Sequence, residues 1–248
     1  MGRTLCVVNQ KGGVGKTTTA INLAAALAKA ESQTLLVDLD PQCNATTGLG
    51  LEPTAQHPLV AGAPLKAAIR PSGIPKLDLL PGSRSFRDVE ALAKGDEAQA
   101  ARLRRQLAGG LNAYDFVLID CPPSLGQLTR TALASSSEVL MPIQCEYFAM
   151  EGLVQMIEVI RDVMQSEPNR LQFGGILLTM FDATLELTWE VEAQVRDFFG
   201  EIVFETIIPR DVAVSEAPSH GQSVIDYAPR SRGSRAYVEL CMEVLERE

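Results

Sequence analysis

The sequence of 248 residues predicts an α/β fold of three layers, in which helices cover both faces of a mostly parallel, twisted sheet. Short, nearly continuous apolar runs alternate with amphipathic helical segments, which is typical of strands that are buried on both faces. A glycine-rich loop separates the first apolar run from the first helical segment. The chain has no internal repeat, charged linker or low-complexity segment, so we expect a single domain over residues 1–248.

The individual elements follow from the spacing of apolar residues. Runs that end at polar or turn residues predict strands, and apolar residues three and four apart predict helices. The predicted strands are residues 5–8, 34–37, 77–80, 116–119, 139–143, 176–178 and 202–204. The clearest predicted helices are residues 17–29, 151–164 and 234–246. Residues 52–75 contain five prolines, and we expect an excursion beside the sheet there.

Composition and charge argue against several classes of protein. Acidic residues number 31 and basic residues 22, which leaves a formal net charge of −9. A net negative charge disfavours binding of the protein to DNA or to an anionic membrane, although a local basic patch can bind either. No apolar run approaches the roughly 18 residues of a membrane-spanning helix. The N-terminal segment lacks the shape of a signal peptide, and the five cysteines include no C-x-x-C pair, so we expect reduced thiols in the cytoplasm.

The strongest functional motif is the loop at residues 10–18, Gln-Lys-Gly-Gly-Val-Gly-Lys-Thr-Thr. It follows a predicted strand and opens a predicted helix, which is the context that a phosphate-binding loop requires. Glycines let backbone N–H groups turn toward phosphate oxygens, and the helix N-terminus adds partial positive charge. We expect Lys16 to contact the β- and γ-phosphates and the Thr17 hydroxyl to ligate Mg²⁺. The predicted nucleotide contacts are Lys11, Gly12, Gly13, Val14, Gly15, Lys16, Thr17 and Thr18.

Three aspartates follow predicted strands. Asp38 and Asp40 end one apolar run, and Asp120 ends another. The carboxyl ends of parallel strands meet at one edge of a sheet, so these side chains should lie beside the phosphate loop. Asp120 is expected to hold Mg²⁺ directly or through water, with Asp38 on the magnesium side of the site. The alternative is that these aspartates only cap strands or form turns.

The loop also departs from the common phosphate-loop sequence, because Gln10 replaces the first glycine and Lys11 precedes Gly12. It resembles the deviant Walker A loop, K-G-G-x-G-K-T, of the ParA/MinD group of P-loop ATPases. In that group the first lysine reaches the partner subunit's nucleotide, which implies that Lys11 acts in trans. A cation supplied only on dimerisation would stabilise the charge on the transferred phosphoryl group. The resemblance also assigns to Asp40 the orientation of the attacking water.

Similarity to the ParA/Soj branch extends along essentially the whole chain. It includes residues 38–46, 120–126, 144–153 and 215–219, the last with the sequence Ser-Glu-Ala-Pro-Ser. The resemblance implies a sheet of eight strands, weak ATP hydrolysis with Mg²⁺, and a homodimer with ATP between its subunits. It further implies a ParB-like activating partner and a positioning or partitioning switch for a chromosome, plasmid or other cargo. Adenine contacts are implied for residues 209–212, including Pro209 and Asp211.

Two departures from the Soj branch concern DNA. Thr184 and Ala213 stand where that branch usually has arginines. Non-specific DNA affinity comes from lysine and arginine at phosphates, so we expect DNA binding and any association with the nucleoid to be weakened. The alternative is a different basic patch. Its candidate residues are Arg84, Arg87, Arg102, Arg104, Arg105, Arg230, Arg232 and Arg235.

The sequence leaves two other functions open. The chain can be a nucleotide-binding dimerisation module with little turnover that recruits a protein partner, or, with less support, a metabolic P-loop enzyme or reductase. A membrane partner is not expected, because the acidic C-terminal helical segment lacks the basic polar face of a MinD-type anchor.

Overall fold

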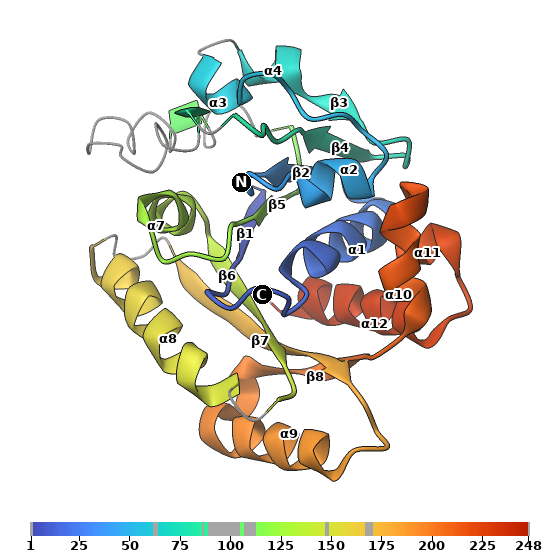
Figure 1. The fold of residues 1–248 in the computed structure, drawn as a ribbon. Helices are drawn as coiled ribbons and strands as arrows, with labels where there is room; N and C mark the ends of the chain where they lie inside the picture. The colour runs from blue at the N-terminus through green and yellow to red at the C-terminus, as the bar shows by residue number, and fades with distance from the viewer. Residues whose placement is uncertain are drawn as a thin grey trace.

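A computed structural model describes residues 2–61, 64–85, 87–88, 105–106, 113–146, 149–166 and 171–247. The described residues form one sheet of eight strands in the order β3-β4-β2-β5-β1-β6-β7-β8. The strands are β1 (Arg3–Val7), β2 (Thr34–Asp38), β3 (Arg70–Pro71), β4 (Leu77–Leu80), β5 (Phe116–Asp120), β6 (Glu138–Gln144), β7 (Gln172–Phe181) and β8 (Val203–Pro209). All pairs are parallel except β3 with β4 (Figure 1).

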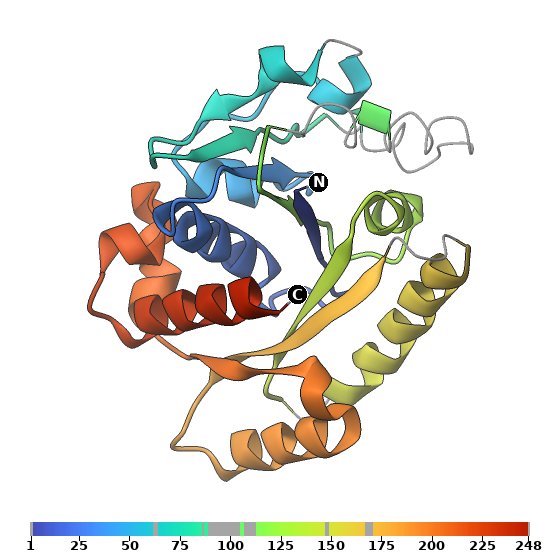
Figure 2. The same cartoon turned by 180° about the vertical axis from the view of Figure 1, so that it is seen from behind.

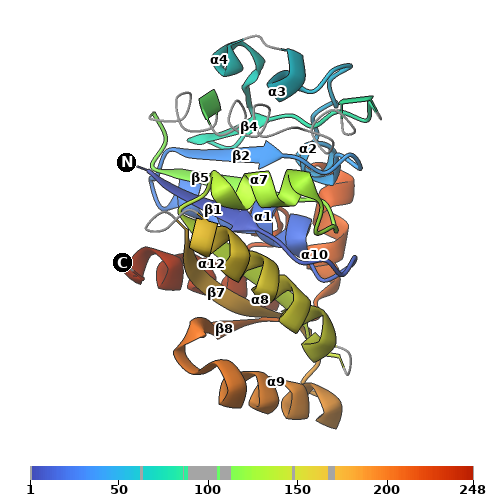
Figure 3. The ribbon, with the colours of Figure 1, turned by 90° about the vertical axis from the view of Figure 1, so that its left-hand side faces the viewer.

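Helices cover both faces of this sheet. The longer helices on one face are α1 (Lys16–Lys29) and α12 (Arg232–Glu246), which lie side by side in the view from behind (Figure 2). The other face is covered by α7 (Gln127–Ala134), α8 (Ala149–Ser166) and α9 (Glu186–Phe199), and Figure 3 shows α7 and α8 along that face. The short helices are α2 (Asn44–Gly48), α3 (Pro58–Ala61), α4 (Leu65–Ala68), α10 (Val212–Glu216) and α11 (Val224–Tyr227), with 3₁₀ turns η1 (Gly200–Ile202) and η2 (Ala217–His220). The predicted three-layer α/β fold is confirmed.

The sheet separates two hydrophobic cores because successive side chains of a strand point to opposite faces. In β5, Val117 and Ile119 pack in the core under α7 and α8. Phe116 and Leu118 pack in the core under α1 and α12. Every residue of β2 and β5 is buried, which explains why these strands have continuous rather than alternating apolar sequences.

The proline-rich excursion lies at one edge of the sheet, and it contributes a strand of the sheet that the sequence did not predict. Its β3 pairs antiparallel with β4, with Arg70 opposite Leu79 and Pro71 opposite Asp78. Proline is tolerated there because β3 is an edge strand, where a missing N–H leaves no ladder bond unmade.

Two predicted strands are longer in the structure than their apolar runs. The run at residues 202–204 overlaps the start of β8, which continues to Pro209. The run at residues 176–178 lies inside β7, which begins at Gln172. The first half of β7 contains Gly174 and Gly175, which interrupt the apolar pattern. Gly175 has φ +152 and lies at an irregularity in the pairing of β7 with β6. A Cβ on Gly175 would come within 2.4 Å of the Phe204 ring, so the glycine is required by a close approach. Of the helices in the described part of the chain, none has the length and hydropathy needed to cross a bilayer.

Candidate nucleotide-binding site

The phosphate loop connects the carboxyl end of β1 to α1. Gly13 and Gly15 have left-handed backbones, with φ +78 and +87, which residues with a Cβ rarely adopt. Gly15 is also the N-cap of α1, so the helix starts directly at the end of the loop. A Cβ on Gly12 or Gly13 would meet nothing within 4 Å. The loop therefore combines a turned backbone with open space on its glycine side, as a phosphate group requires.

Lys16, the first residue of α1, is held inside this loop. Its side chain is buried, and its Nζ donates to the backbone carbonyl of Lys11 at 2.8 Å. Burial lowers the pKa of Lys16, and the nearby charges of Asp120 and Asp40 oppose that change. The ammonium group thus has a loop carbonyl as its partner in the ligand-free protein, and this bond can be exchanged for one to a phosphate oxygen.

Asp120 lies beside Asp38, because β2 and β5 are neighbours and the two residues are partners in the register. Asp120 is fully buried, and neither carboxylate oxygen has a hydrogen-bond partner among the described residues. Burial, followed by the charge of Asp38, raises the pKa of Asp120 well above its usual range. The Thr17 hydroxyl lies near enough to oppose this rise, although it does not reach hydrogen-bond geometry. A buried carboxylate without partners is costly unless a cation joins it.

These observations fit Mg²⁺. Carboxylate and hydroxyl oxygens are ligands that Mg²⁺ prefers, and in phosphate-loop proteins they are completed by nucleotide oxygens and water. The unpartnered Asp120 oxygens lie at the end of β5, and the Thr17 hydroxyl lies at the start of α1, next to Lys16. Asp120 and Thr17 are therefore the residues that would hold the ion.

Asp38 is bound differently from Asp120. Its Oδ2 accepts hydrogen bonds from the Thr46 hydroxyl at 2.6 Å and the Thr46 backbone N–H at 2.9 Å. Its Oδ1 accepts from the backbone N–H of Asp40 at 3.2 Å. Burial nevertheless raises the pKa of Asp38 to about 6. Asp38 thus braces the loop after β2. Asp40 is also buried, and its Oδ1 accepts from Gln42 N–H at 2.8 Å.

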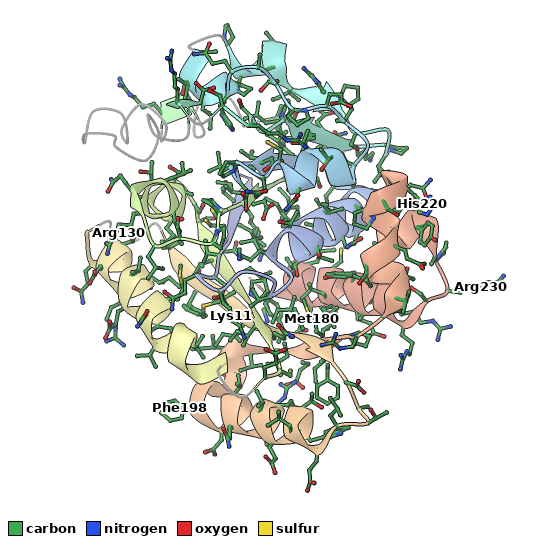
Figure 4. The ribbon with its side chains drawn as sticks, in the orientation of Figure 1. Lys11, Arg130, Met180, Phe198, His220 and Arg230 are labelled. Carbon is green, nitrogen blue, oxygen red and sulfur yellow. The ribbon has the colours of Figure 1, made fainter. Side chains whose placement is uncertain are left out.

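Lys11 lies outside the group formed by Lys16, Thr17 and Asp120. Its side chain is 39% exposed and forms an ion pair with Glu146 at the end of β6, with an Nζ–Oε2 distance of 3.0 Å. Lys11 extends from the phosphate loop near the centre of the molecule in Figure 4. In the single chain, then, Lys11 is available at the surface beside the site rather than placed on a phosphate position.

Comparison with known proteins gives the family of the chain. The family model described as an AAA domain matches residues 2–173. The chromosome-partitioning ATPase Soj of Treponema pallidum is 45% identical over 250 residues, covering 100% of this chain and 99% of that protein. The chromosome partitioning protein ParA of Myxococcus xanthus is 44% identical over 253 residues, covering 100% of this chain and 89% of that protein.

The chain belongs to the ParA/Soj family of chromosome-partitioning ATPases. Membership of a family of ATP hydrolases confirms the class of enzyme predicted from the sequence. Among solved structures, the septum site-determining protein MinD of Pyrococcus horikoshii, complexed with Mg-ADP, superposes with a TM-score of 0.84. It is 27% identical and the match covers 99% of this chain and 97% of that one.

The residues predicted to contact adenine, 209–212, lie at the end of β8 and the start of α10. The side chain of one of them, Asp211, forms hydrogen bonds within the protein. Asp211 caps α10 by accepting from Ala213 N–H at 3.0 Å, and it accepts from Gly233 N–H at 2.8 Å. Both carboxylate oxygens of Asp211 are therefore engaged with backbone groups of this ParA/Soj family member. Pro209 is the last residue of β8.

The positions related to DNA also differ in their surroundings. Thr184 is exposed, and its hydroxyl donates to Asp182 at 2.6 Å. Ala213 lies in α10 next to Asp211. Of the other arginines, Arg230, Arg232 and Arg235 are exposed around the start of α12, whereas Arg102 and Arg104 lie outside the described residues.

Sequence reasoning missed two residues that shape the site. The Thr46 hydroxyl donates to the Asp38 carboxylate, and its Oγ1 accepts from the backbone N–H of Gly82 at 2.9 Å. His57, in the proline-rich excursion, is buried, with its Nε2 3.0 Å from the carbonyl oxygen of Asp38. Its Nδ1 accepts from Leu59 N–H, so Nε2 carries the hydrogen and donates to Asp38. Thr46 lies inside a family motif and could have been found there, but no local pattern marks His57.

The buried carboxyls make the ligand-free protein less stable as pH rises. The folded chain keeps its Asp120 proton at pH values where the unfolded chain, with a pKa near 3.8, has released it, so the unfolding free energy falls from about pH 4 upward. We expect Asp120→Asn to raise the unfolding free energy at pH 8 by about 1 kcal/mol or more. The gain should shrink toward pH 4. Urea unfolding in EDTA without nucleotide measures this.

The matched control is Asp162→Asn, because Asp162 is 63% exposed and makes only a long ion pair with Arg130 among the described residues. Its unfolding free energy should stay within about 0.5 kcal/mol of that of the unmodified protein at both pH values. An Asp120→Asn protein no more stable than the unmodified chain at pH 8 contradicts this view of the site.

Proposed function

We propose that this chain binds ATP with Mg²⁺, dimerises with the nucleotide between its subunits, and hydrolyses it slowly as a switch that positions a chromosome, plasmid or other cargo. The observation that supports this best is the meeting of Lys16, Thr17 and the unpartnered Asp120 at one sheet edge, with Lys11 left at the surface beside them. In this proposal, residues 1–248 form a single ATPase domain that works in the cytoplasm.

Each residue has a defined task in this proposal. When bound, Mg²⁺ would neutralise phosphate charge and orient the γ-phosphoryl group. Lys16 exchanges its bond to the Lys11 carbonyl for one to the β- and γ-phosphates, and the N–H groups of residues 12–18 surround the phosphate oxygens. Asp40 orients the attacking water, and Asp38 keeps the Asp40 loop in place.

Lys11 couples hydrolysis to dimerisation. In the single chain its ammonium group pairs with Glu146 at the surface, so it can leave that position at low cost. On dimerisation Lys11 would reach the nucleotide of the partner subunit and stabilise charge that develops on the transferred phosphoryl group. A ParB-like protein is the proposed activator of this step.

The first experiment measures phosphate release and ATP-dependent dimerisation. Lys16→Ala should lower turnover by about 100-fold or more, because it removes a charge that stabilises the transition state. Lys11→Ala should abolish ATP-dependent dimers on a sizing column, whereas Asp40→Ala should form dimers and retain them. Lys66→Ala is the matched control, because Lys66 is exposed on α4 far along the chain from the loop.

Two outcomes argue against the proposal. An Asp40→Ala protein that stays monomeric with ATP contradicts the switch. Dimerisation with ATP, combined with phosphate release no faster than in Lys16→Ala, favours instead a nucleotide-binding dimerisation module that recruits a partner without turnover.

We further propose that non-specific DNA binding is weakened in this chain. Restoring the two basic residues in the double variant Thr184→Arg with Ala213→Arg adds four cationic side chains per dimer. This should steepen the slope of log K against log salt by about 3 to 4 and give retardation of DNA near physiological salt. The variant with glutamine at both positions is the neutral control. Strong retardation by the unmodified protein at that salt would show that another patch, such as Arg230, Arg232 and Arg235, binds DNA.

A further inference from the structure

Thr179, near the end of β7, contacts the phosphate loop from outside the loop motif. Its side chain is buried, and its Oγ1 lies 2.9 Å from the carbonyl oxygen of Val14 and 3.1 Å from that of Ile143. The methyl group of Thr179 is near the same place, since its Cγ2 would be 3.8 Å from a Cβ on Gly15. A residue 165 positions away in the chain therefore packs on the Val14–Gly15 peptide.

The carbonyl of Val14 is the nearer of two acceptors for the single hydroxyl hydrogen of Thr179, and this contact bears on which way the Val14–Gly15 peptide points. The carbonyl of Val14 and the N–H of Gly15 belong to one planar trans peptide and point in opposite directions. Because the carbonyl is directed at Thr179, the Gly15 N–H is directed away from β7. The glycines on either side of Val14 both have positive φ, and glycine permits either orientation of such a peptide. Steric hindrance within the loop thus leaves the orientation open, and the Thr179 hydrogen bond selects one.

The residue after Thr179 adds to this arrangement. Met180 has φ +52, a left-handed backbone that is unusual for a side chain of its size. Its Cε would lie 3.8 Å from a Cβ on Gly15, so it reaches the same glycine as Thr179. Uncommon backbone conformations persist where the surroundings enforce them, and this one lies where β7 meets the phosphate loop.

We propose that Thr179 is a positioning residue for nucleotide binding, whose hydroxyl orients the Val14–Gly15 peptide so that the Gly15 N–H is presented to phosphate oxygens. The inference rests on the proposed nucleotide site, because it assigns a task to the outer side of that site's loop. Thr179 touches neither nucleotide nor metal in this role, and it acts through Gly15.

The test uses binding of a fluorescent ADP analogue with Mg²⁺ to the full chain, since ADP removes dimerisation from the measurement. Thr179→Val keeps the shape but removes the hydroxyl, and it should weaken binding by about five- to tenfold, the usual effect of one lost hydrogen bond. Thr179→Ser should bind within about twofold of the unmodified protein, and Thr179→Cys, a weaker donor, should lie between serine and valine.

The matched control is Thr34→Val, at the first residue of β2, where the strands begin rather than where they end at the phosphate loop. Thr34 is buried and its hydroxyl donates to the Ser32 carbonyl at 3.0 Å, so the substitution removes the same type of bond far from the loop. Its ADP affinity should be unchanged. In turnover assays, Thr179→Val should raise KM for ATP more than it lowers kcat, and the amide resonance of Gly15 should shift in Thr179→Val but not in Thr34→Val.

Unchanged binding in Thr179→Val, or equal weakening in the serine and valine variants, overturns the inference. If Thr179→Val does not fold, the comparison of serine with cysteine decides the question in the same way. A failure of the proposed nucleotide site is distinguishable, because the unmodified protein would then fail to bind Mg²⁺ and ADP at all. A failure of the proposed dimerisation or hydrolysis would leave the ADP measurement and its comparison of variants intact.

Discussion

The nucleotide site depends on a cluster of buried carboxyl groups at the carboxyl edge of the sheet, whose ionisation is unfavourable without a cation beside them. Asp38 and Asp120 lie side by side at the ends of β2 and β5, fully buried, and Asp40 follows closely. Lys16 favours the ionised form of Asp120, but burial outweighs this effect and also lowers the pKa of Lys16 itself. Neighbouring carboxylates in a site of low polarity are unfavourable when ionised, so the ligand-free site is electrostatically incomplete. A divalent cation and a nucleotide that brings phosphates to the glycine loop would complete it.

The rest of the fold holds this unfavourable arrangement in place. The strand order sets β1, β5 and β2 side by side, which brings the phosphate loop and two of the aspartates to one edge. Thr46 uses its hydroxyl and its N–H on Asp38, and the neutral ring of His57 connects the proline-rich excursion to the Asp38 backbone. On the opposite side Thr179 connects β7 to the loop. The two cores on either face of the sheet supply the apolar burial that offsets the cost of the charged edge.

Features set by local sequence could be predicted, and features set by distant contacts could not. The strands after which Asp38 and Asp120 stand are continuous apolar runs because both of their faces are buried, and parallel strands converge at one edge whatever their order. By contrast, the first half of β7 was missed because Gly174 and Gly175 break its pattern. The bond from Gly233 to Asp211 and the bond from Thr179 to Val14 join segments far apart in the chain, so no local pattern encodes them.

The most direct test of this account is the affinity of the protein for ADP, measured by calorimetry with Mg²⁺ and again in EDTA, for the unmodified chain and for Asp120→Asn. If the buried carboxylate edge requires a divalent cation, Mg²⁺ should strengthen ADP binding to the unmodified chain by about tenfold or more, roughly 1.4 kcal/mol or more. Most of that gain should be lost in Asp120→Asn. An equal effect of Mg²⁺ on both proteins, or no effect on the unmodified one, would contradict the account.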